Sequence, residues 1–323
     1  MLYPLKFKPI LFSKIWGGKK IKSLRSEGEN LENIGESWEV AAVNGYCSVV
    51  ENGFLAENTL DELVDVYLGD LVGDEIFNEY GEFPLLVKII DAAQNLSIQV
   101  HPNDEIAAER HNSFGKTEMW YVLDAEPDAF LIAGFNRKIT EKEYLKAIEN
   151  NILEEYLNKI PIKKGDVMFI PAGCVHSIGK GSLILEIQQS SDITYRLYDY
   201  NRLETNGLPR ELHTELAVDA IDFDNWKNKK IVPNILPNTL TKLVDCEYFT
   251  TNILEIDKKI ELDLSKIFSF VLLSVVEGEI FCEYPNGKIE VKTTETVLIP
   301  AEMDNITIIP KTKTARILEI SIC

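Results

Sequence analysis

Cysteine is scarce in this chain, and the few cysteines form no pattern. Five are spread over 323 residues, and no two have the Cys-x-x-Cys spacing. An odd, dispersed set argues against a disulfide framework and is typical of reduced thiols in the cytoplasm.

Basic residues and long apolar runs are also in short supply. Lysine and arginine number 33 against 52 acidic residues, which gives a formal net charge of −19. This balance argues against nucleic acid or an anionic membrane as the partner, and an anionic ligand would need a locally positive pocket. No run predicts a transmembrane helix. Proline and lysine interrupt the first residues, MLYPLKFKPILFSKIW, so a signal-peptide core is not expected. We expect a cytoplasmic protein.

The chain instead has many short apolar runs broken by turn residues, and one stretch is the most informative. Val167–Ile170 predicts a strand that ends at Pro171-Ala172-Gly173, and His176 follows where a new strand begins. Glu186 lies inside the next apolar run, and Arg196 lies on the strand after it. Inward side chains of neighbouring strands meet in the lumen of a barrel, so we expect these three polar side chains near one another.

A second polar pattern lies upstream, where Leu96–His101 alternates strictly between apolar and polar residues. Ser97, Gln99 and His101 share one face of the predicted strand. Polar side chains on a buried face need partners. Either this face meets solvent or it belongs to a site, and a metal site explains Gln99 and His101 best.

A third strand, within residues 115–123, places Lys116 and Glu118 on one face. Glu118 can therefore join the residues of the other two strands. The predicted metal ligands are Gln99, His101, Glu118 and His176. Two imidazoles, an amide and a carboxylate suit Zn²⁺ and are compatible with Mn²⁺ or Fe²⁺. A divalent cation there could polarise a substrate oxygen.

The turn before His176 resembles the second sequence motif of the cupin barrels, although Lys180 stands where that motif usually ends in asparagine. The chain resembles the class I mannose-6-phosphate isomerases (phosphomannose isomerases) of the short bacterial type. The segments that carry the resemblance are Trp16–Gly18, Gly35–Val40, Leu96–Pro102, Gly115–Leu123 and Gly165–Arg202. The resemblance implies zinc binding by Gln99, His101, Glu118 and His176, a catalytic Arg196, and a substrate pocket with Ser97, Lys116 and Glu186.

The resemblance also implies the reaction, which is interconversion of mannose 6-phosphate and fructose 6-phosphate through a cis-enediol. Arg196 is the expected partner of the enediolate, because a guanidinium stays charged, unless it is a structural ion pair with an acid such as Glu186. Glu186 is either the base or the residue that orients Arg196. Lys116 contacts phosphate or a sugar hydroxyl, and Trp16 either walls the sugar site or belongs to the core. Further candidates for the phosphate are Lys19, Lys20 and Arg202.

Two other functions stay open at this level. One is a non-catalytic sugar-binding cupin, against which Arg196, Glu186 and Lys116 argue. The other is an iron-dependent cupin oxidoreductase, and Gln99 favours the isomerase over it. The expected partner is a small-molecule sugar phosphate, and the protein is expected to be a monomer or a homodimer.

The expected fold is mainly β: a cupin (jelly-roll) barrel that carries the metal site, a few helices and a second, degenerate barrel. We expect a catalytic domain in residues 1–225 with helical insertions, a connector in 226–240 and a metal-free barrel in 241–323. The helical insertions are expected at about 57–80, 140–158 and 209–221. Around Pro300-Ala301 the sequence echoes the turn before His176, which would place Asn305 at the position of that histidine.

Overall fold

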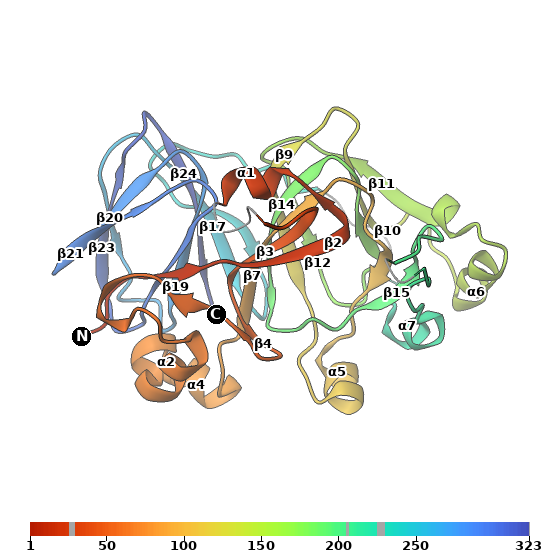
Figure 1. Cartoon of the computed structure of the whole chain (residues 1–323), viewed down its shortest axis with the longest axis horizontal. Helices are drawn as coiled ribbons and strands as arrows, with labels where there is room; N and C mark the ends of the chain where they lie inside the picture. Colours follow the sequence, from red (N-terminus) through yellow and green to blue (C-terminus); the bar gives the residue numbers. More distant parts are fainter. Residues whose placement is uncertain (26–29, 205–206, 225–229, 323) are drawn as a thin grey trace. The chain divides into compact units, whose positions relative to one another are not determined.

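The computed structural model describes residues 1–25, 30–204, 207–224 and 230–322, which form mostly antiparallel strands with short helices (Figure 1). The chain divides into two compact units. One holds Leu11–Ser37 and Lys88–Val232, and the other holds Met1–Ile10, Trp38–Val87 and Pro233–Cys323. In the described part of the chain, no helix is long and apolar enough to cross a membrane.

Two sheets share one core cluster, and the predicted metal ligands lie on or beside the strands of these sheets. The larger sheet has the order β12 (Val167–Ile170), β9 (Glu118–Ala125), β14 (Ser182–Gln189), β7 (Leu85–Ala92), β2 (Ile10–Gly18), β3 (Ile34–Val40). The smaller sheet has the order β11 (Leu157–Pro161), β10 (Phe130–Phe135), β13 (His176–Ile178), β8 (Ile98–Val100), β15 (Tyr195–Tyr198). Alternate apolar side chains of these strands, such as Trp120, Val122 and Ile178, pack into one core cluster.

The turn between β12 and β13 has the predicted form. The chain leaves β12 at Pro171 and reverses at Gly173, whose φ of 83° is a conformation that favours glycine. The amide of Gly173 donates a 2.9 Å hydrogen bond to the carbonyl of His101. This bond ties the turn to the end of β8, and His176 then begins β13.

Short helices belong to this unit as well. They are α1 (Lys20–Leu24), α5 (Asp104–His111), α6 (Glu141–Glu149) with the 3₁₀ turn η3 (Leu153–Tyr156), and α7 (Thr214–Ala220). Thr140 and Glu143 form the expected capping box of α6. The helix ends earlier than the predicted residue 158 because Asn151 is left-handed (φ 55°) and Leu157–Pro161 pairs with β10. The helix expected at 209–221 is likewise shorter.

The second unit contains a seven-stranded and a four-stranded sheet, drawn mostly in blue in Figure 1. The larger has the order β16 (Thr241–Asp245), β17 (Thr250–Ile256), β24 (Ala315–Ser321), β19 (Val271–Glu277), β22 (Thr296–Ile299), β1 (Leu5–Lys8), β6 (Val49–Val50). The smaller has the order β18 (Ile260–Asp263), β23 (Asn305–Pro310), β20 (Ile280–Tyr284), β21 (Gly287–Val291).

Residues from the N-terminal part of the chain therefore belong to the second unit, which differs from the expected single break near residue 225. Leu5 pairs with Leu298, and Phe7 pairs with Val50, so strand pairing over long sequence separations sets the division. The helical region expected at 57–80 also lies here. It consists of α2 (Leu60–Tyr67), α3 (Gly69–Val72) and α4 (Asp74–Tyr80), with η2 (Gly53–Leu55), β4 (Ala42–Val43) and β5 (Tyr46–Cys47) before it. Of the expected connector, residues 226–229 lie outside the described residues.

The two units repeat one strand order. The run β12-β9-β14-β7 corresponds to β22-β19-β24-β17, and β11-β10-β13-β8 corresponds to β21-β20-β23-β18. The placement of Asn305 opposite His176 was wrong, however. Asn305 is exposed, whereas Ile306 is buried in the core and pairs with Leu262 as His176 pairs with Gln99. The turn after Pro300 is one residue longer than the turn after Pro171, and this shifts every later side chain to the other face.

Candidate metal centre and active site

Three of the four predicted ligands form one buried cluster. His101, Glu118 and His176 are each 1% exposed, and their candidate ligand atoms all lie within 4.8 Å of one another. Strand pairing explains the convergence. His176 pairs with Gln99, two residues before His101 and on the same face of the strand, and Glu118 pairs with the last residue of β12, just before the turn that leads to His176.

The orientation of the two imidazoles suits a metal ion. Nδ1 of His101 donates to the carbonyl of Ile193, and Nδ1 of His176 donates to the carbonyl of Cys174, both at 2.8 Å. Because carbonyls only accept, each Nδ1 carries the proton and each Nε2 turns a lone pair toward Glu118. Burial lowers the pKa of both histidines, to about 4 for His176, so the rings are neutral at physiological pH.

The carboxylate of Glu118 lies against both imidazoles. Glu118 lies 3.5 Å from Nε2 of His101 and 3.4 Å from Nε2 of His176. Nε2 of His101 and both oxygens of Glu118 are buried, and among the described residues none of the three has a hydrogen-bond partner. Burial and the neighbouring Glu186 raise the pKa of Glu118, and a bound cation would relieve that cost. These residues therefore fit a divalent metal.

The side chain of Gln99 borders this cluster. Its Nε2 atom lies 3.3 Å from Nε2 of His176, and its Oε1 atom accepts a 3.3 Å hydrogen bond from Ser97. Turning the amide by 180° places its oxygen, which is a metal ligand, against the cluster. The structure thus brings the predicted fourth ligand and the predicted substrate-binding Ser97 to the same place.

A buried charge network adjoins the cluster of His101, Glu118 and His176. One member of this network was not predicted from the sequence. Lys88 forms a 2.7 Å ion pair with Glu186, and the indole of Trp120 donates to the other carboxylate oxygen at 2.7 Å. Burial alone would raise the pKa of Glu186, but Lys88 and Lys116 hold it below its usual value. The available signal was a lysine in the middle of the apolar run Leu85–Ile90.

Lys116 lies between these two groups. Its ammonium is 3.5 Å from Glu118, and burial together with Lys88 lowers its pKa. Two lysines and two glutamates offset one another, so a divalent cation at Glu118 would leave the site positive. That is the local charge which an anionic ligand needs in a chain of net charge −19.

Arg196 lies on β15, where it pairs with Gln99. Its guanidinium donates through Nη1 to the carbonyl of Glu211 at 2.8 Å, and burial lowers its pKa. Glu186 pairs with Lys88, and among the described residues it forms no ion pair with Arg196.

The remaining candidates are placed less centrally. Trp16 is 4% exposed and packs in the core cluster with Trp120. Lys20 forms a 2.7 Å ion pair with the half-exposed Asp124. Arg202 is bound to Asp199, which also holds Arg210 at 2.6 Å.

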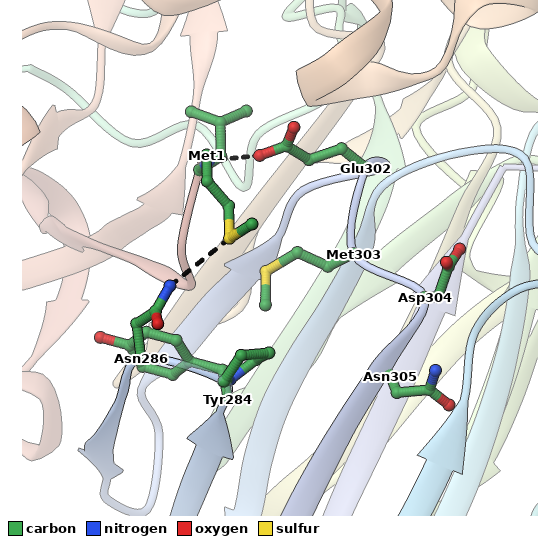
Figure 2. Close-up of a pocket in the computed structure, with 9 residues that line it drawn as sticks. Met1, Tyr284, Asn286, Glu302, Met303, Asp304 and Asn305 are labelled. Atoms are coloured by element: carbon green, nitrogen blue, oxygen red, sulfur yellow. Dashed lines mark hydrogen bonds between the residues drawn. The ribbon is translucent and has the colours of Figure 1, made fainter.

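A hollow of about 290 Å³ lies at one end of the second barrel (Figure 2). The β20–β21 turn contributes Tyr284 and Asn286, and the β22–β23 turn contributes Glu302, Met303 and Asp304. In the first barrel the cluster of His101, Glu118 and His176 lies at the end that carries the β12–β13 turn, which corresponds to the β22–β23 turn. Beneath this hollow the second barrel is filled by an apolar cluster that includes Met303.

Comparison with known proteins agrees with this geometry. Residues 5–133 match the family of the phosphomannose isomerase type I catalytic domain, and residues 239–318 match the mannose-6-phosphate isomerase cupin domain. Both barrels are thus cupin-type, as expected.

Relatives of similar length also match. The chain is 40% identical over 284 residues to the mannose-6-phosphate isomerase ManA of Bacillus subtilis, covering 85% of this chain and 86% of that protein. It is 36% identical to the mannose-6-phosphate isomerase of Streptococcus mutans, covering 86% of each chain. The crystal structure of mannose 6-phosphate isomerase from Bacillus subtilis superposes with a TM-score of 0.88 at 33% identity, covering 99% of each chain.

Proposed function

This chain belongs to the type I phosphomannose isomerase family, and we propose that it interconverts mannose 6-phosphate and fructose 6-phosphate with a bound divalent metal ion. The observation that carries the proposal is the buried cluster of His101, Glu118 and His176, in which Nε2 of His101 and both oxygens of Glu118 lack a hydrogen-bond partner among the described residues. Family membership favours this isomerase over a sugar-binding cupin without activity and over an iron-dependent oxidoreductase.

The ligands that we propose are Gln99, His101, Glu118 and His176, and the ion that we propose is Zn²⁺. Two neutral imidazoles with two oxygen donors suit zinc, and no cysteine is part of the set. When bound, the cation supplies Lewis-acid polarisation of a sugar oxygen.

We assign proton transfer and stabilisation of the enediolate to protein groups around the metal. Isomerisation moves a proton from C2 of the open-chain aldose to C1 and builds negative charge on oxygen in between. Glu186 is the candidate acceptor of that proton, since Lys88 and Lys116 favour its ionised form. Arg196 offers a permanently charged planar donor to the enediolate oxygen.

The other two expected substrate contacts follow from position. Lys116 is buried beside Glu118 and can meet a sugar hydroxyl or the phosphate. Ser97 already bonds to Gln99, so its hydroxyl lies at the same surface. Trp16 is packed in the core, and we assign it a supporting role beneath the site.

A coupled assay of fructose 6-phosphate formation from mannose 6-phosphate tests the proposal. We expect turnover that a chelator abolishes and that added Zn²⁺ restores, with about one zinc ion per chain by elemental analysis. Turnover unaffected by complete metal removal would refute the metal requirement. Oxygen uptake with bound iron, and no isomerisation, would favour the oxidoreductase instead.

A further inference from the structure

His213 occupies a helix-capping position without acting as a cap. It directly precedes α7 and is its N-cap residue, yet its side chain makes no capping hydrogen bond to the helix. This position usually holds serine, threonine, aspartate or asparagine, whose short side chains accept from the first helical amides. In this chain Nδ1 of His213 accepts the backbone N–H of Arg196 at 3.1 Å instead. Its hydrogen-bonding capacity is therefore directed to β15.

The same segment holds Arg196 in two further places. The backbone amide of His213 donates to the carbonyl of Arg196 at 2.7 Å. The guanidinium of Arg196 donates through Nη1 to the carbonyl of Glu211 at 2.8 Å. Glu211 and His213 thus bind both the main chain and the side chain of Arg196. On its other side, Arg196 pairs with Gln99.

We propose that His213 is a positioning residue for Arg196. With the Glu211 carbonyl, it fixes where the guanidinium stands relative to β8, the strand that carries Gln99. The inference rests on the proposed function, in which Arg196 meets the developing negative charge. The guanidinium has donors left for this task, because Nε of Arg196 has no partner among the described residues.

The protonation state of His213 agrees with this role. Nδ1 can accept only from a neutral ring that carries its proton on Nε2. The groups that face the ring are Arg196 and Tyr195 from β15, Glu211 from its own segment and His111 from α5. Burial and the charge of Arg196 lower the pKa of His213, so the accepting form is present at neutral pH.

Two substitutions separate positioning from capping. His213→Ser supplies a favoured N-cap residue, but its hydroxyl is too short to reach the amide of Arg196. His213→Asn places an amide oxygen close to where Nδ1 lies. We expect the serine variant to keep the melting temperature and metal content while kcat falls about tenfold, because small misplacements of a catalytic group are costly. KM should change little, and the asparagine variant should recover much of the loss.

A matched control lies in the same side-chain cluster. Nε2 of His111 forms a 2.8 Å hydrogen bond with the hydroxyl of Tyr195, next to Arg196, but does not contact Arg196. His111→Ala should therefore leave kcat unchanged. An equal loss in His111→Ala and His213→Ser would identify a general packing effect and overturn the proposal. Wild-type kcat in His213→Ser, or an asparagine variant no better than serine, would also overturn it.

A readout that does not depend on turnover keeps this inference distinct from the proposed function. In the ¹⁵N spectrum of the holoprotein, His213 should show the Nε2–H tautomer, and the Arg196 amide signal should move in His213→Ser. Absence of mannose 6-phosphate turnover in the wild type would refute the proposed function alone. A protonated Nδ1 on His213 at neutral pH would refute the positioning role alone.

Discussion

The two barrels share a strand order and differ in what their strands carry inward. By strand register, each proposed metal ligand of the first barrel has an aliphatic counterpart in the second. The pairs are Gln99 and Leu262, His101 and Leu264, Glu118 and Val271, His176 and Ile306. All four aliphatic residues belong to the core cluster of the second barrel. The same positions of the barrel thus carry metal-ligand candidates in the first barrel and apolar core residues in the second.

Glu186 has a polar counterpart in the second barrel. Glu186 pairs with Trp120 on β9, and Glu319 pairs with Leu273 on β19 in the same register. Lys88 is the partner of Glu186, whereas Glu319 accepts a 2.6 Å hydrogen bond from the amide of Asn252. Burial raises the pKa of Glu319, which has no ion-pair partner among the described residues, while Lys88 and Lys116 lower the pKa of Glu186. The neighbours of a buried carboxylate therefore set the direction in which its pKa shifts.

The largest effect is expected from His176→Ala. Loss of one ligand leaves an incomplete shell, so metal content and kcat should fall together, kcat by about a thousandfold. Elemental analysis and the coupled assay measure both. Full metal occupancy in this variant would remove His176 from the ligand set.

The counterpart substitution, Ile306→Ala in the second barrel, should act on stability alone. Deleting a buried aliphatic side chain costs about 2–5 kcal/mol of unfolding free energy, and the metal site is untouched. Urea unfolding gives the cost, and kcat of the folded variant should equal that of the wild type. A loss of metal in this variant would contradict the contrast between the barrels.

Arg196 sharpens the comparison, because β15 has no counterpart in the four-stranded sheet of the second barrel. In Arg196→Lys the charge is kept but the planar fork is lost. We expect kcat to fall about a hundredfold or more, equivalent to about 3 kcal/mol, with metal and fold retained. A raised KM with kcat preserved would show instead that Arg196 binds phosphate.

The smallest effect concerns Glu319→Gln. A carboxyl whose pKa is raised by folding stabilises the protein below its unfolded pKa of about 4.3, and this contribution is lost as pH rises. Glutamine does not titrate, so the stability of the variant relative to the wild type should rise from pH 5 to pH 8. Glu186→Gln is the matched control and should show no trend between pH 5 and pH 8, since the lowered pKa of Glu186 confines its pH-dependent contribution to pH values below that range. Thermal melts at both pH values distinguish the two.

The parts of this molecule that could be predicted from sequence are those encoded locally. His176 follows a turn whose Pro and Gly residues fix its geometry, and Gln99 and His101 alternate on one short strand. The shift from Asn305 to Ile306 could not be predicted, because a single extra turn residue exchanges the two faces of a strand. The role of Lys88 depends on Glu186, which lies on a different strand and far along the chain.

The insertion of β1 beside β22 also bears on how the chain is made. Leu5 is synthesised long before its partner Leu298. At about 5–20 residues per second, the strands between residues 88 and 198 have time to associate while β22 does not yet exist. Over that interval β1 has an unpaired edge and two apolar side chains, Leu5 and Phe7. The nascent chain therefore exposes one edge of β1 until β22 is synthesised.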